Sequence, residues 1–222
     1  MNSLAIELST KQGSVAVFSD ERLVAEKTWK EEGTRSQHVF HVIPNLLEEA
    51  SVAPDQLGTY YVGRGPGSYS GLRIAMTAAR GMALPSEAKV FALSSGEALA
   101  AETAEREGAT TVAVVGDARR NMIWVGVFRV LAMQLETLHS WNVMDTASLP
   151  AVLPGPCVVV SSDWKRIGDH LEAMNLPEGR LIRESRYPSA RYVGKVGMRK
   201  LGSGEPSEPL SPIYSHPPVG RK

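Results

Sequence analysis

The segment Gly63-Arg64-Gly65-Pro66-Gly67-Ser68-Tyr69-Ser70-Gly71-Leu72-Arg73 decides how the fold of this chain is interpreted. It follows the strand-like residues 60–62 and runs into a helical pattern over residues 70–83, so it predicts a strand, a tight turn and a helix in succession. Glycine fills four of the nine positions from 63 to 71, which allows the backbone to approach another group closely.

This turn suits either a phosphate group or a purely structural role. A glycine turn before a helix offers free N–H groups and a positive dipole end, so Gly65, Gly67 and Ser68 are candidate phosphate or nucleotide contacts. The order of residues differs from the dinucleotide-binding motif, which needs glycine where Ser68 or Ser70 stands, and no P-loop lysine follows. A structural turn with Ser68 or Ser70 capping the helix is an equal alternative.

The pattern on both sides of the turn predicts an α/β protein. Residues 4–30 contain three β-rich segments separated by short polar breaks, which is typical of a β-meander. Helical periodicity covers residues 36–50 and 94–106, and a strand is expected at residues 90–93. The order of the first half is therefore β-β-β-α-β-α-β-α.

The second half repeats the first at a shift of 110 positions, which places Leu4–Phe18 over Val114–Phe128 without a gap. The shift matches the Val-x-Val-Phe of both segments and sets the acidic Glu7 against Asp117, as duplication of a β-meander lobe would. We therefore expect an N-terminal lobe over residues 1–108 and a C-terminal lobe over residues 109–202. Residues 203–222 are rich in Pro, Gly and Ser, which predicts an extended tail anchored by Pro212-Ile213-Tyr214.

The two helices nearest the glycine turn carry more apolar surface than one buried face needs. The helix at 70–83 has a second apolar stripe of Ile74, Ala78 and Gly81, and the helix at 36–50 adds Phe40, Val42 and Leu47 outside its main stripe. This surplus favours a subunit interface, with a deep core position as the alternative.

Composition limits the partners of the chain. Lys plus Arg and Asp plus Glu are equal at 24 each, so direct, tight binding of a nucleic acid by this chain alone is disfavoured. No apolar run approaches the roughly 18 residues of a membrane span, and the chain begins without a secretory signal, so we expect a cytoplasmic protein. The single cysteine, Cys157, precedes three valines and is expected in the core.

The sequence offers little chemistry of its own. His38 and His41 stand three apart, but no third ligand completes a metal site, so none is expected. Asp117-Ala118-Arg119-Arg120 is interpreted as a solvated ion cluster in a turn. No nucleophile and base can be paired, so no catalytic residue is assigned.

Several segments together resemble the TsaB (YeaZ) family. They are Leu4-Ala5-Ile6-Glu7-Leu8-Ser9-Thr10, Gly13-Ser14-Val15-Ala16-Val17, the Arg35–Pro44 helix with His38, the segment from Gly63 to Ile74, and Asp117-Ala118-Arg119. The resemblance is strong to about Phe128 and thin afterwards, apart from the closing Pro212-Ile213-Tyr214.

The resemblance implies an actin-like ATPase (ASKHA, ribonuclease H-like) fold of two duplicated β-meander and helix lobes. It also implies a non-catalytic subunit that pairs with TsaD in the transfer of threonylcarbamoyl to adenosine 37 of tRNA (t6A biosynthesis), with TsaE in the larger complex and tRNA contacted indirectly. TsaD carries a metal motif of the His-Met-Glu-Gly-His type that this chain lacks. On the first two helices the interface would comprise His38, Val39, Val42, Ile43, Leu46, Leu47, Arg73, Ile74, Thr77, Ala78 and Gly81.

Two alternatives to this function stay open. Glu7 stands where the family usually has Asp, which weakens the case for a retained metal-nucleotide site, and Tyr69-Ser70 replace a more usual Phe-Thr. No cofactor is assigned to this chain, and binding of ATP or ADP at the junction with a partner is left open. One alternative is a nucleotide-binding actin-like enzyme that uses the glycine turn, Glu7 and Asp117 around Mg-ATP. The other is a homodimeric structural protein that pairs through the same helices.

Overall fold

The computed structural model describes residues 1–30, 38–174, 176 and 180–213. These residues form two units, one of Met1–Ala98 with Pro188–Ile213 and one of Leu99–Tyr187. None of the helices in the described ranges is long and apolar enough to cross a membrane.

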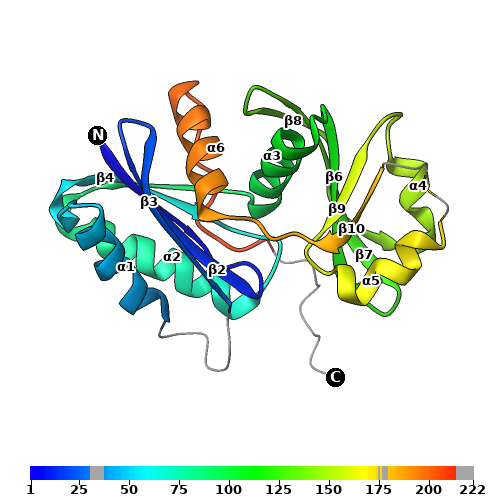
Figure 1. Cartoon of the computed structure of the whole chain (residues 1–222), viewed down its shortest axis with the longest axis horizontal. Helices are drawn as coiled ribbons and strands as arrows, with labels where there is room; N and C mark the ends of the chain where they lie inside the picture. Colours follow the sequence, from blue (N-terminus) through cyan, green and yellow to red (C-terminus); the bar gives the residue numbers. More distant parts are fainter. Residues whose placement is uncertain (31–37, 175, 177–179, 214–222) are drawn as a thin grey trace. The chain divides into compact units, whose positions relative to one another are not determined.

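The first unit is built on a five-stranded mixed sheet in the order β3-β2-β1-β4-β5. The first three strands pair antiparallel, and β4 and β5 join parallel to β1 (Figure 1). The strands are β1 (Asn2–Glu7), β2 (Gln12–Ser19), β3 (Arg22–Lys30), β4 (Leu57–Gly63) and β5 (Lys89–Leu93).

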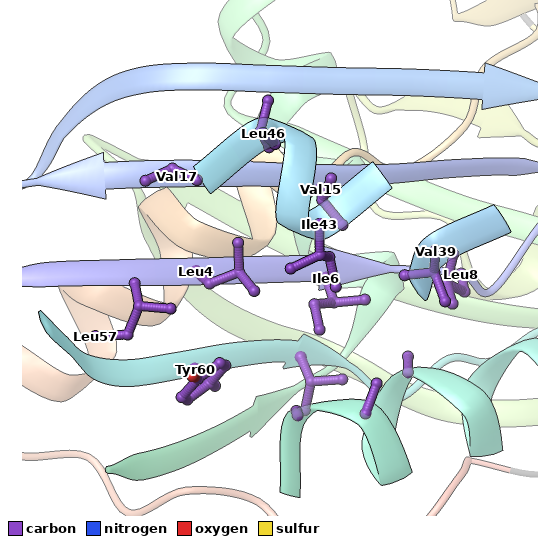
Figure 2. Close-up of a cluster of buried hydrophobic side chains, with 14 of the residues drawn as sticks. Leu4, Ile6, Leu8, Val15, Val17, Val39, Ile43, Leu46, Leu57 and Tyr60 are labelled. Carbon is purple, nitrogen blue, oxygen red and sulfur yellow. The ribbon is translucent and has the colours of Figure 1, made fainter. Parts of the chain in front are cut away.

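Helices cover both faces of this sheet. On one face lie α1 (His38–Glu49) and α2 (Tyr69–Ala83), whose apolar side chains share one core cluster with alternate residues of β1, β2 and β4 (Figure 2). On the other face lies α6 (Ala190–Gly202), which contacts β1, β2, β4 and β5. Short 3-10 turns at Pro54–Gln56 and Leu84–Ser86 follow α1 and α2.

The second unit repeats this plan with the sheet order β10-β9-β6-β7-β8. Its strands are β6 (Thr111–Arg119), β7 (Met122–Leu131), β8 (Gln134–Asp145), β9 (Val158–Ser161) and β10 (Leu181–Ser185). Its helices are α3 (Ser95–Glu107), which begins in the first unit, α4 (Leu149–Val152) after a 3-10 turn at Thr146–Ser148, and α5 (Trp164–Glu172). One core cluster joins α4 and α5 to the sheet and includes Cys157, which is buried as expected.

Read from the opposite edge, the second sheet has the order β8-β7-β6-β9-β10, which corresponds strand for strand to β3-β2-β1-β4-β5 of the first. This correspondence confirms the predicted fold of two duplicated meander lobes. The 110-residue shift holds for the second strand of each lobe, because β2 begins at Gln12 and β7 at Met122. Val15 and Val125 accordingly lie in the corresponding core clusters of their units.

The first strand of each lobe departs from the predicted match by one residue. Val17 pairs with Leu4 in the first unit, whereas its counterpart Val127 pairs with Ala113. A register shift near the end of β6, between Asp117 and Arg119, absorbs the extra residue, as a β-bulge does.

The predicted equivalence of Glu7 and Asp117 is therefore wrong. Glu7 follows Ile6, a member of the core cluster under α1 and α2, so it points to the opposite face of its sheet. Asp117 instead reaches Arg166 of α5, with 3.4 Å between the carboxylate Oδ2 and Nε. Gly116 takes the position that corresponds to Glu7.

The unit boundaries also differ from the expected ranges at the C-terminal end. The helix α6 was expected in a lobe of residues 109–202, but its glycines let it pack closely on the first sheet. A Cβ on Gly194 or Gly197 would overlap the rings of Phe18 and Tyr61. Residues 203–213 continue along the first unit, and Tyr214 of the expected apolar anchor lies outside the described residues.

Candidate partner-binding face and the glycine turn

The helix α2 presents a polar and aromatic stripe to solvent. Its buried side, including Leu72 and Ala75, packs on the sheet, and its N-terminus is capped by Ser68, whose Oγ accepts from the Gly71 amide at 3.4 Å. Positions that return every three or four residues therefore face outward. The exposed positions are Tyr69, Ser70, Arg73, Thr77, Arg80 and Gly81, followed by Leu84 just beyond the helix.

This stripe, called the α2 face below, contains an aromatic ring, a cationic side chain, a glycine and an apolar side chain. Tyr69 is 55% exposed, and the guanidinium carbon of Arg73 lies 4.0 Å from the centroid of its ring. Gly81 has no atom within 4 Å of the place a Cβ would occupy, so another backbone can come close there. Leu84, at 77% exposed, ends the face with an apolar side chain.

The helix α1 contributes less surface than its sequence suggested. Its main stripe is buried in the core, while Phe40 is 52% exposed and His38 is exposed beside Trp29, with 5.4 Å between the ring centroids. The exposed Phe40 adds an apolar group on a second helix that packs on the same sheet face as α2.

The predicted interface residues divide by exposure. His38, Arg73, Thr77 and Gly81 are exposed, and Val42 and Ile74 are half-buried. The buried members are Val39, Ile43, Leu46, Leu47 and Ala78. The buried residues support the shape of the two helices from within the core, and the exposed ones are the groups that a partner can touch directly.

Three exposed apolar residues on or next to α1 and α2 were absent from the predicted set, namely Phe40, Tyr69 and Leu84. Phe40 stands outside the main stripe of its helix, and this signal was present in the sequence. Tyr69 and Leu84 flank the expected helix, where helical periodicity gives no information about which side chain faces solvent.

The glycine turn packs against the end of β1. A Cβ on Gly67 would overlap the carbonyl oxygen of Ser9, and one on Gly71 would overlap that of Leu8. Gly65 adopts a φ of 96°, a backbone conformation that favours glycine. These glycines are therefore explained by close approach to the protein's own backbone.

The hydrogen-bonding groups of the turn are also used within the chain. The Gly65 amide donates to Ser95 Oγ at 3.0 Å, and the Ser68 amide donates to the Ser9 carbonyl at 2.6 Å. The Gly65 carbonyl accepts from the Ser95 amide at 2.9 Å and from Ser94 Oγ at 3.0 Å. Of the three predicted phosphate contacts, Gly65 and Ser68 thus have amides that already donate hydrogen bonds within the chain, and Gly67 is exposed.

Glu7 closes the inner side of this turn. Its side chain is fully buried, its Oε1 accepts from the Ser9 amide at 2.5 Å, and its Oε2 lies where a Cβ on Gly63 would go. Burial raises the pKa of the Glu7 carboxyl, against smaller opposing effects of hydrogen bonds with Ser9 and Ser95. This favours the neutral acid.

The residues around Glu7 do not fit the Mg-ATP that the sequence left open as an alternative. A magnesium site needs ionised, accessible carboxylates, whereas Glu7 is enclosed among serine hydroxyls and glycine backbone. Within residues 1–30, 38–174, 176 and 180–213, no cluster of three His, Cys, Asp or Glu side chains could hold a metal ion. In the second unit, Asp117 bonds to the Arg119 amide at 2.7 Å and pairs with Arg166, as a surface ion cluster.

The amino-acid sequence matches a protein-family model and known relatives. A family model described as TsaD: tRNA N6-adenosine threonylcarbamoyltransferase matches residues 33–156. The tRNA threonylcarbamoyladenosine biosynthesis protein TsaB of Bacillus subtilis is 30% identical over 129 residues, which are 58% of this chain and 56% of the relative. The match thus spans about half the length of that relative.

Two further comparisons extend over almost the whole chain. The tRNA threonylcarbamoyladenosine biosynthesis protein TsaB of Escherichia coli is 24% identical over 224 residues, covering 96% of this chain and 94% of the relative. YeaZ from Pseudomonas aeruginosa has a similar solved structure, with a TM-score of 0.81 and 24% identity over 96% of this chain and 100% of that chain. The structural match supports the two-lobed fold.

Proposed function

Because the chain belongs to the TsaB/YeaZ family, within the wider family of the TsaD model, we propose that it is a non-catalytic subunit in the biosynthesis of threonylcarbamoyladenosine in tRNA. It pairs with TsaD, which transfers threonylcarbamoyl to adenosine 37, and the pair joins TsaE in a larger complex. Any ATP or ADP binds at the junction of the two subunits and not to this chain alone. The chain contacts tRNA indirectly and works in the cytoplasm.

The α2 face is the observation that carries this proposal. It combines an exposed tyrosine, an arginine held over its ring, and an open glycine at positions that lie on one side of a single helix. Aromatic residues and arginine are enriched at protein interfaces, and a glycine allows a partner helix to approach. Exposed Phe40 on α1 enlarges the apolar area.

The glycine turn supports the non-catalytic part of the proposal. Its amides and carbonyls bond to Ser9, Ser94 and Ser95 of the same chain. Glu7, an acidic group on the inner side of the turn, is buried with a raised pKa that favours the neutral form. A turn closed in this way serves to shape α2 and hold its N-terminus in place.

Light scattering coupled to chromatography tests the proposal with the wild-type chain. The mass is measured for the chain alone, for TsaD of the same organism alone, and for their mixture with and without Mg-ATP. We expect a one-to-one complex whose mass is the sum of the two chains, of which this chain contributes 24.0 kDa. A mass of twice 24.0 kDa that persists with TsaD present would favour the homodimeric structural protein instead.

Calorimetry distinguishes the proposed non-catalytic subunit from the remaining alternative, a nucleotide-binding enzyme. The chain alone is titrated with Mg-ATP, and release of phosphate is followed in the same sample. We expect neither binding heat nor turnover from this chain alone. Binding with turnover, together with no complex with TsaD under any nucleotide condition, would overturn the proposal in favour of a nucleotide-binding enzyme.

A further inference from the structure

The segment 205–213, called the strap here, is fastened to the glycine turn by one residue. The guanidinium of Arg64 pairs through Nη1 with the Glu208 carboxylate and donates through Nε to the Ser211 carbonyl at 2.8 Å. The Arg64 carbonyl in turn accepts from the Ile213 amide at 2.8 Å. The side chain of Arg64 is only 13% exposed, so it is largely shielded from solvent.

The strap also covers part of the outer edge of β5. The Ala92 amide donates to Ser207 Oγ at 2.9 Å, and the Ala92 carbonyl accepts from the Glu208 amide at 3.1 Å. Ala92 and Glu208 form an isolated antiparallel bridge, and β5 is otherwise the last strand of its sheet. The strap therefore satisfies backbone groups that an edge strand would present to another chain.

Polar contacts hold the strap, and apolar burial contributes little. None of the described residues 203–213 is buried, and Leu210 is exposed. The strap leaves α6 through Gly202 and Gly204, and neither glycine has an atom within 4 Å of its Cβ position. Gly204 has a φ of 79°, so the chain turns at an uncrowded, flexible residue type. Segments with few apolar contacts open at a lower free energy than the core that carries them.

The beginning of the strap is tied to a separate, inner ion pair. Lys200 of α6 bonds to Glu97 of α3 at 2.9 Å, and Glu205 lies 3.7 Å from the same ammonium group. Both members of the Glu97 and Lys200 pair are largely shielded from solvent. This end stays attached to α6, so movement of the strap is concentrated beyond Glu205, where Arg64 is its main fastening.

We propose that the strap is a latch, fastened on Arg64, that opens and closes over the outer edge of β5 and the glycine turn while the sheet beneath stays folded. Opening frees the guanidinium of Arg64 and the backbone groups of Ala92 together, because the same segment covers both. Closing restores the Glu208 pair and the edge bonds in one step. Arg64 is thus a positioning residue for the strap, and this role is independent of the proposed function.

Amide hydrogen exchange followed by NMR on the full chain tests the latch. The informative amides are those of Ala92, Glu208 and Ile213, which bond across the strap, compared with amides of the β1 and β2 pair. In the wild type we expect the three strap amides to exchange at similar opening rates, faster than the sheet amides. Glu208→Gln should speed their exchange about tenfold, because it removes the charged partner of Arg64, while the sheet amides stay unchanged.

Two further variants keep the test decisive. Glu87→Gln removes an exposed carboxylate outside the strap and should leave all rates as in the wild type. Arg64→Gln should repeat the effect of Glu208→Gln on the Glu208 and Ile213 amides. The latch would be overturned if the strap amides exchanged only at the rate of the sheet amides, or if Glu208→Gln left their exchange equal to that of Glu87→Gln.

Discussion

The carboxyl group of Glu7 fills the space that a side chain on Gly63 would need. These two residues come from the ends of β1 and β4, which lie side by side as parallel neighbours in the first sheet. Ser95 Oγ also lies within 2.6 Å of the same point. The contact explains why the turn begins with glycine, and it makes the turn sensitive to changes on either residue.

Gly63→Ala is expected to destabilise the chain by about 1–3 kcal/mol, because the added methyl group overlaps Glu7 Oε2 in a packed interior. Chemical denaturation at neutral pH measures the free energy of unfolding. Gly81→Ala is the matched control, since its Cβ meets no atom within 4 Å and alanine favours the helix. We expect the control to gain about 0.5–1 kcal/mol. Equal effects at both positions would contradict this account of the turn.

Glu7→Gln should make the stability of the chain less dependent on pH. Burial raises the pKa of Glu7 above its ordinary value of 4.5, so the folded state holds this proton more tightly than the unfolded state. The favourable contribution of the neutral acid is complete below pH 4.5 and is lost as the pH rises through the folded pKa. Glutamine stays neutral throughout.

The difference between the two proteins isolates this one group. Urea unfolding midpoints are measured from acid to mildly alkaline pH for the wild type and for Glu7→Gln. The advantage of the variant should grow with rising pH and then level off. Two parallel curves would show that the Glu7 carboxyl has the same proton affinity in both states.

Lys200→Met should cost about 3 kcal/mol at neutral pH, because it leaves Glu97 largely buried without its cation. Burial already raises the pKa of Glu97, and the Lys200 charge opposes that rise. The double variant Glu97→Leu with Lys200→Met removes both charges and should recover most of the loss. Thermal and chemical denaturation of the three proteins measure this. A double variant no more stable than Lys200→Met alone would contradict the account.

Much of the fold could be predicted from the sequence because it depends on local periodicity and on a repeated pattern. The Val-x-Val-Phe of β2 and β7 identified the duplication, since alternating apolar residues fix which side of a strand is buried. The bulge near Asp117 could not be predicted in this way. One inserted residue moves every residue before it to the opposite face of the sheet. The apolar composition of the strand does not show where such an insertion lies.

The candidate interface was predicted at the level of helices, and its individual residues were harder to assign. Ala78 is 4% exposed although it directly follows exposed Thr77 and lies one turn after half-buried Ile74. A small apolar residue suits either the core or a close helix contact, so periodicity alone does not decide between them.

The strap illustrates contacts that sequence reasoning does not reach. Arg64 and Glu208 are separated by 144 positions, and no local pattern relates them. Composition predicts an extended tail, but the attachment of residues 205–213 to the glycine turn depends on the tertiary fold. The same holds for α6, whose packing on the first sheet follows from Gly194 and Gly197 meeting aromatic rings of distant strands.

The central claim, that the α2 face binds a partner, is tested by Thr77→Glu combined with Gly81→Glu. Both positions are exposed, and Gly81 has open space, so the fold should remain intact and its unfolding midpoint close to that of the wild type. Gln134→Glu combined with Ser140→Glu adds the same number of acidic side chains on exposed positions of β8 and is the control.

Light scattering of each protein mixed with TsaD of the same organism gives the answer directly. We expect the wild type and the β8 control to form a one-to-one complex, and the α2 variant to elute as separate chains because two buried, unpaired carboxylates oppose association. A one-to-one complex that persists undiminished in the Thr77→Glu, Gly81→Glu variant would contradict the assignment of the partner to the α2 face.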